Sequence, residues 1–146
     1  MVRYEHCQFA KTLLITLCIG VVLCLVVAGI LREGADITLG LAAILAVCAL
    51  LFASLTVEVT DEHLRWRFGP GLIRKQVLLA DIDHAEVTRT KVIEGWGIHL
   101  TSRGWLYNVS GFRAVAIRLK TGKQFLLGSD EPEKLVMALR DGINVK

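Results

Sequence analysis

The sequence predicts a membrane protein of the α+β class, in which a hairpin of two membrane helices precedes a head of about seven or eight short antiparallel strands and one helix. Two long apolar runs without charge predict the hairpin, because each is long enough to cross the hydrocarbon core of a bilayer. From about Thr56 apolar and polar residues alternate, and a period of two predicts strands with one buried face. Near residue 130 a proline among acidic residues predicts the start of the helix.

The two apolar runs are expected as transmembrane helices over residues 12–31 and 37–57, joined by an extracytoplasmic loop over 32–36. The whole chain of 146 residues is 53% hydrophobic, yet 21% of its residues are charged, and none of these lies in either run. The first run is longer than the roughly 7–15 apolar residues of a cleaved signal peptide, and no A-x-A site follows it. A core hairpin of a soluble protein is also disfavoured, because the remaining chain is too short to wrap two such helices.

The distribution of basic residues predicts which side of the membrane holds the head. Arg3 and Lys11 precede the first run, Arg32 alone lies between the runs beside two acids, and several arginines follow the second run. The positive-inside rule therefore places both termini in the cytoplasm. The expected division is a cytoplasmic N-terminal segment over 1–11 and a cytoplasmic domain over 58–146.

The four cysteines agree with a reducing compartment. Cys18, Cys24 and Cys48 lie inside the apolar runs, where they serve as apolar filler, and no cysteine lies in the polar part. Cys7 precedes the first run and is a weak candidate for acylation.

Alternating segments of the polar part predict its strands. A turn at Asp61-Glu62-His63 separates the first two, and Gly69-Pro70-Gly71 separates the second from the third. The expected strands after the first, which begins near residue 56, are 64–68, 73–79, 82–91, 97–101, 105–109, 112–120 and 123–127. The strand at 82–91 is polar, so we expect it at the edge of a sheet.

The C-terminal helix is predicted by its end signals. Ser129 suits an N-cap, Pro132 suits the first turn, and acids accompany them. Leu135 and Leu139 belong to an apolar stripe, and Gly142 is expected to end the helix.

The stretch from Glu94 to Gly111 is rich in aromatic residues and glycines and allows three interpretations. Trp96 shares a strand face with apolar neighbours, and Trp105 and Tyr107 share another, which favours packing against the core or over the open end of a barrel. Tryptophan and tyrosine are also typical of a membrane interface. A ligand groove is the third interpretation.

Basic residues gather early in the polar part, close to the expected membrane face. Lipid or partner contact is the hypothesis for these residues and for the two tryptophans of the aromatic stretch; the candidates are Arg65, Arg67, Arg74, Lys75, Trp96 and Trp105. The plainer interpretation is a solvated strand face together with the positive-inside bias. From Glu58 onward 14 basic residues stand against 11 acidic ones, so the head is only mildly basic.

The sequence predicts no catalytic residue, no cofactor and no metal site. Gly95-Trp96-Gly97 lacks the third glycine of a dinucleotide fingerprint, and Ser110 lacks the preceding glycine of a nucleophile elbow. Alternation directs His84 away from Asp81 and Asp83, which disfavours a metal site there. No dense basic helix or stacking motif predicts nucleic-acid binding.

Several short motifs together resemble a known family. They are RFGPG at 67–71, GWGIHL at 95–100, GWLYNVSG at 104–111, AVAIRLKTGK at 114–123 and LGSDEPEKLVMAL at 127–139. With the preceding hairpin, the chain from about Ser54 resembles small bacterial inner-membrane proteins with a pleckstrin-homology-like (PH-like) domain. The resemblance implies a bent antiparallel sheet or partly open barrel of about seven strands with a C-terminal helix, and no catalytic residues. Arg65-Trp66-Arg67 matches the R-x-R of phosphoinositide-binding domains, but the first strand has Glu58 and no lysine, so inositol-lipid specificity is not implied.

Two functions are expected from these features. The leading hypothesis is a binding or scaffold module that docks a protein partner, or a second copy of the chain, at the cytoplasmic membrane face. An exposed strand edge near 82–91 suits such docking. The alternative is the sensing of anionic lipid headgroups by the basic early strands and the interfacial tryptophans.

Overall fold

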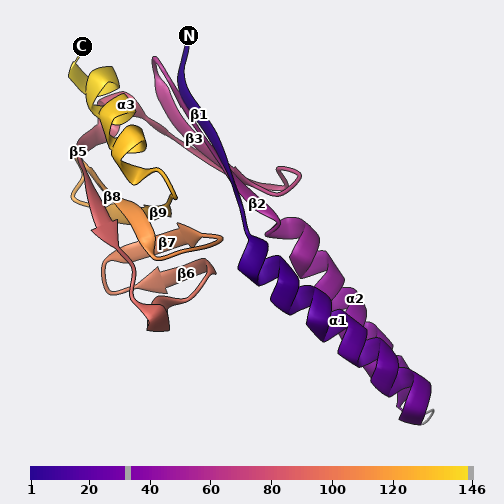
Figure 1. Cartoon of the computed structure of the whole chain (residues 1–146). Coiled ribbons are helices and arrows are strands. Elements are labelled where there is room, and N and C mark those ends of the chain that lie inside the picture. The colour runs from indigo at the N-terminus through magenta and orange to yellow at the C-terminus, as the bar shows by residue number, and fades with distance from the viewer. Residues whose placement is uncertain (32–33, 145–146) are drawn as a thin grey trace.

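The structure, a computed structural model, describes residues 1–31 and 34–144 and belongs to the α+β class (Figure 1). A strand precedes two helices, eight further strands follow, and a helix comes last. The strands are β1 (Val2–Phe9), β2 (Ser54–Thr60), β3 (His63–Phe68), β4 (Ile73–Leu78), β5 (Ile82–Arg89), β6 (Gly97–Thr101), β7 (Gly104–Asn108), β8 (Arg113–Leu119) and β9 (Gln124–Gly128). The helices are α1 (Lys11–Leu31), α2 (Ala35–Leu51) and α3 (Pro132–Asn144), with short 3₁₀ turns η1 (Leu79–Asp81) and η2 (Val92–Glu94).

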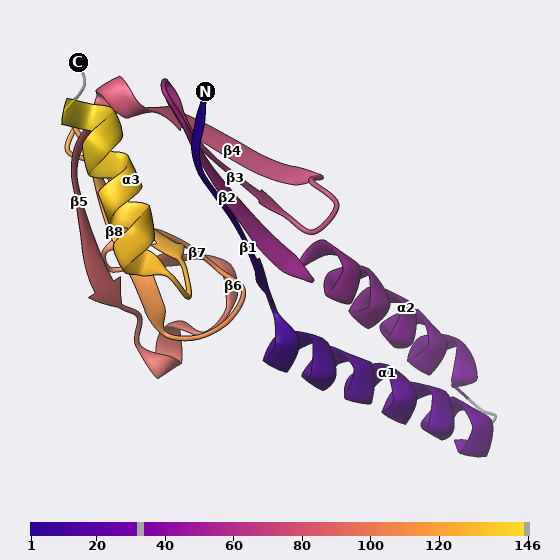
Figure 2. The ribbon, with the colours of Figure 1, turned by 45° about the horizontal axis from the view of Figure 1, so that its top comes forward.

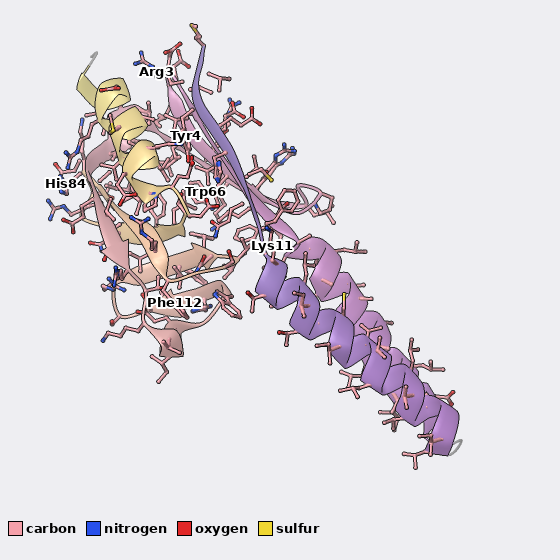
Figure 3. All side chains as sticks on the ribbon, viewed as in Figure 1. Arg3, Tyr4, Lys11, Trp66, His84 and Phe112 are labelled. Carbon is pink, nitrogen blue, oxygen red and sulfur yellow. The ribbon has the colours of Figure 1, made fainter. Side chains whose placement is uncertain are left out.

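The helices α1 and α2 lie side by side and are antiparallel. Together they project away from the rest of the molecule (Figures 1 and 2). No residue of α1 is buried, and in α2 only Ala42 is. The side chains that project from them carry carbon atoms almost alone (Figure 3). Such a continuous exposed apolar surface is typical of a membrane or protein contact.

The first sheet has the order β1-β2-β3-β4 and is antiparallel throughout. Its inner face carries the apolar residues of the alternating pattern: Leu55 and Val59 of β2 and Leu64 of β3 are fully buried. The strands β1 and β2 pair next to each other, and the amide N–H of Ala10 donates to the carbonyl of Ala53 at 3.0 Å. The two helices therefore stand where a turn would connect β1 to β2.

The second sheet has the order β5-β8-β9-β7-β6. Its pairs are antiparallel except β7 with β9, which is parallel because the β6–β7 hairpin is placed beyond β9. Helix α3 packs against β5 and β8 (Figure 2). The two sheets and α3 together form the head of the molecule.

The core of the head lies between the sheets and is rich in aromatic rings. Trp66, labelled in Figure 3, lies between the sheets with its ring centroid 5.2 Å from that of Tyr107 and 5.0 Å from that of Phe125. Leu135 and Leu139 of α3 are fully buried in the same cluster. The apolar stripe predicted for the C-terminal helix therefore joins the core.

The eight strands after the helices and α3 confirm the sequence prediction, and the polar strand β5 lies at an edge as expected. The second apolar run differs from its expected bounds: α2 ends at Leu51, and 54–57 belong to β2, because their alternation suits a sheet with one buried face. The helix begins at Ala35, inside the expected loop 32–36; Arg32 and Glu33 lie outside the described residues, as do 145 and 146 at the end of the expected domain.

Three further features differ from the sequence prediction or were missed by it. Residues 1–11 were expected only as a cytoplasmic segment, yet they contain β1, which the sequence hides because its inward side chains at Tyr4, His6 and Gln8 are polar or amphipathic. The β7–β9 pair is parallel. Helix α3 does not end at Gly142 but continues to Asn144, and Gly142 lies against Leu79, where a Cβ would lie 2.6 Å from Cδ1 of that leucine.

Candidate functional site

The strands β3 and β4 bring the predicted arginines to one face of the first sheet. Leu64, Trp66 and Phe68 point into the core, so Arg65 and Arg67 between them point outward and are exposed. Arg67 is the register partner of Arg74 on β4, which places Arg74 on the same outer face. The period of two therefore gathers three arginines on the surface opposite the core.

These arginines line an open pocket of about 580 Å³ on the first sheet. The four predicted basic residues all belong to its lining, which is formed by Thr56, Glu58, Arg65, Trp66, Arg67, Arg74, Lys75 and Gln76. Sequence reasoning missed Thr56, Glu58, Trp66 and Gln76. Thr56, Glu58 and Gln76 follow from strand register, since they are the partners of Arg67 and Arg65 on β3.

The charge of this pocket is not balanced within the structure. Arg67 and Arg74 oppose each other on neighbouring strands, a placement in which like charges repel. Among residues 1–31 and 34–144, none of the four basic side chains forms an ion pair. Glu58 is the one acidic residue of the lining. The pocket is thus suited to an anion.

Lys75 lies differently from the arginines. It is the register partner of Trp66, whose ring is buried between the sheets. Its Nζ lies 5.4 Å from the centroid of the Tyr107 ring, within the range of a cation–π contact. Lys75 therefore links the open edge of β4 to the second sheet, while the three arginines face away from it.

The two predicted tryptophans lie outside the pocket, on or beside the second sheet. The indole N–H of Trp96 donates to the carbonyl of Gly111 at 3.2 Å, and its ring stacks on Phe112. Trp105 is half-exposed and stands opposite the exposed Leu100. The structure therefore does not bring the tryptophans and the basic residues into one site.

The aromatic stretch 94–111 divides between core and surface. Tyr107 and Val109 are buried, as expected for core packing. Trp105 lies on the same face of β7 as Tyr107 but is half-exposed, whereas Tyr107 packs against Trp66 and Phe68 of the first sheet. Among the described residues, no group of three histidine, cysteine or acidic side chains is placed to hold a metal ion.

Comparison of the chain with protein-family models, with curated proteins and with solved structures found no match. A proposal for its function therefore rests on the geometry of the site.

Proposed function

We propose that this chain is an integral membrane protein whose helices α1 and α2 cross a bacterial inner membrane, with both termini and the head on the cytoplasmic side. The pocket of the first sheet binds the phosphate group of an anionic lipid headgroup. The head would then be a PH-like binding module in the sense of the family resemblance, without catalytic activity.

The helices support the membrane part of this proposal. Among the described residues one helix, α1, is long and apolar enough to span a bilayer. The apolar helix α2 has 17 residues and a length of about 25 Å, slightly less than a typical hydrocarbon core. Local thinning of the bilayer accommodates such a difference at modest cost.

The opposed pair of Arg67 and Arg74 is the observation that carries the lipid part. Arg67 pairs with Thr56, which is only two residues, or roughly 7 Å, beyond the first residue of β2. Since β2 starts three residues after α2 ends, the pair lies close to the level where the chain leaves the bilayer. Each basic side chain near an anionic leaflet contributes about 1 kcal/mol.

A thermal-unfolding experiment on the full chain in zwitterionic micelles tests the pocket. Added short-chain phosphatidylglycerol is expected to raise the unfolding midpoint, because a ligand that binds only the folded state stabilises it. The double variant Arg67→Gln/Arg74→Gln should lose most of this increase. The control Lys120→Gln/Lys123→Gln removes the same charge from the β8–β9 turn, which lies far from the helices, and should keep it (Figure 1).

Two results would contradict the proposal that the pocket binds a lipid phosphate group. Equal losses in the two double variants would mean that general electrostatic attraction, rather than the pocket, causes the shift. An increase that inorganic phosphate reproduces at the same concentration would identify a soluble phosphate compound, rather than a lipid, as the ligand.

A second candidate function is the docking of a protein partner on the free edge of β5. This strand has a single neighbour, β8, and five of its eight residues are exposed. An open edge of this kind accepts an added strand. Photocrosslinkers at Asp83 and Glu86 in native membranes should capture the same partner, and one at Lys123 should not. Recovery of uncrosslinked chain alone would remove this candidate.

A further inference from the structure

We propose that the η2 turn is a second membrane contact of the head, in which Val92 and Ile93 insert into the interfacial layer of the leaflet from which α1 and α2 emerge. This inference rests on the proposed membrane orientation of the helices and goes beyond it. It assigns a lipid-binding role to a segment that neither the pocket nor the core uses.

The exposure of the turn is its first distinguishing feature. Val92 is 78% exposed and Ile93 is 92% exposed, although neither belongs to the apolar helices. Burial of a valine or isoleucine side chain stabilises by about 1.5–3 kcal/mol. Transfer of both exposed side chains from water into an apolar environment is therefore favourable.

The turn is also held rigidly in this conformation. Glu94 accepts hydrogen bonds from the amide N–H of Lys91 at 2.6 Å and from Nη2 of Arg103 at 3.2 Å. Arg103, from the turn between β6 and β7, also donates to Oγ1 of Thr88 and to the carbonyl of Arg89, each at 3.0 Å. One arginine thus fastens the turn to the end of β5.

These bonds decide what the turn presents to its surroundings. The side chain of Glu94, the one acid of the turn, is only 10% exposed, and the hydrogen bond from Lys91 followed by the charge of Arg103 holds the pKa of its carboxyl below the ordinary value. The outward side chains are therefore those of Val92, Ile93 and the exposed Lys91. Two aliphatic groups beside a cation suit the interface of an anionic leaflet.

The position of the turn identifies the bilayer as its partner. One residue separates β1 from α1, and two separate α2 from β2, so short connections fix the head on the helices. In both ribbon views the turn between β5 and β6 forms the lowest part of the head, and α1 and α2 extend downward and to the right of it (Figures 1 and 2).

The first sheet presents a similar tip on the same side. Leu72, in the loop between β3 and β4, is 78% exposed. The preceding Gly69 touches the last turn of α2, since a Cβ at this position would lie 2.4 Å from the carbonyl oxygen of Leu50. The head thus has one apolar tip on each sheet. The junction between α2 and the head lies beside the tip of the first sheet, which contains Leu72.

A protein partner fits the η2 turn less well than lipid does. Stable protein interfaces bury roughly 1,200–2,000 Å², far more than two aliphatic side chains provide. A head that the helices already hold at the membrane needs much less buried area for a second contact. Tethering gives that contact a high effective concentration.

Site-directed spin labelling of the full chain in lipid nanodiscs tests the inference. The four native cysteines are first changed to alanine, and single cysteines are introduced by Ile93→Cys, by Thr121→Cys at the β8–β9 turn and by Val26→Cys in α1. Collision rates of each label with oxygen, which concentrates in lipid, and with a water-soluble nickel chelate are compared. The ratio of oxygen to nickel collisions at residue 93 should be several-fold higher than at residue 121 and approach that at residue 26.

The three sites separate failure of this inference from failure of the proposed function. A lipid-like ratio at residue 26 with a water-like ratio at residue 93 would overturn the membrane contact of η2 and leave the spanning helices intact. A water-like ratio at residue 26 would overturn both.

Discussion

At the scale of single residues, Gly104 is required where the parallel pair of the second sheet begins. Its φ is +107°, and a Cβ at this position would lie 2.0 Å from the carbonyl oxygen of Gln124 on the neighbouring β9. The contact is with backbone, which has no rotamer by which to move away. Gly122, in the β8–β9 turn, also has a positive φ of +84°, but a Cβ there would meet nothing within 4 Å.

This difference predicts unequal costs for the same substitution. Gly104→Ala should lower the free energy of unfolding by about 3 kcal/mol or more, from backbone strain and overpacking together. Gly122→Ala should cost only about 1 kcal/mol, from strain alone. Denaturant unfolding in micelles, followed by tryptophan fluorescence, measures both. Equal costs would mean that β7 and β9 do not approach as closely as described.

Tyr4 predicts how stability changes at alkaline pH. Burial raises the pKa of its hydroxyl from 10.0 to about 12. Between these values an unfolded chain releases the proton while the folded chain keeps it, so stability falls as the pH rises from about 10 to about 12. The hydroxyl lies close to Ser129, which partly offsets the effect of burial on its pKa, but among the described residues it makes no hydrogen bond of regular geometry. Tyr4→Phe should therefore unfold at a midpoint that is no lower at neutral pH and that declines less over the alkaline range.

At the scale of elements, the sequence predicted those strands in which apolar and polar residues alternate strictly, as in β3 with Leu64, Trp66 and Phe68 inward. It did not predict β1, whose inward residues include His6 and the buried Gln8, because these carry no apolar period. Gln8 instead donates to the carbonyl and hydroxyl oxygens of Ser110, a contact between segments far apart in the chain. Tertiary partners of this kind are not visible in a local pattern.

The candidate site was likewise predicted only as far as local sequence patterns allow. The arginines of β3 and β4 were identified from charge and expected strand position, but the opposition of Arg67 to Arg74 depends on a register that turn lengths set. The role of Arg103 as the fastening of η2 depends on the contact between two different turns. Residue types could thus be predicted from the sequence, whereas the residue pairs on which the proposed functions rest could not.

The packing of α3 on η1 yields a prediction at this scale. A Cβ at Gly142 would lie 2.6 Å from Cδ1 of Leu79, whose side chain is buried. In the native chain Leu79→Ala should cost about 2–5 kcal/mol by leaving a cavity. With Gly142→Ala present, the added methyl group partly fills that cavity, so the cost should fall by about 1 kcal/mol. A double-mutant cycle of unfolding free energies measures this coupling, and strict additivity would contradict the contact.

At the scale of the whole molecule, the helices are an insertion into one β-hairpin of the head. Phe9 pairs with Ser54, and the next pair, Ala10 with Ala53, is joined by the 3.0 Å hydrogen bond. A two-residue turn is the natural connection for such a pair, and Asn-Gly is the sequence that favours it most. The head is therefore expected to fold apart from the two helices only if β1 is kept with it.

A shortened chain tests this architecture. Residues 1–10 joined through Asn-Gly to 53–146 should fold without detergent into a β-rich monomer, because the first sheet keeps all four strands. The deletion removes Phe52, whose ring packs edge-on against Phe68, at a cost of about 1 kcal/mol. Residues 54–146 alone should aggregate, because loss of β1 leaves β2 as an open edge. Circular dichroism and light scattering compare the two. Equal solubility and structure would show that β1 is dispensable, and an insoluble Asn-Gly chain would show that the head needs its helices to fold.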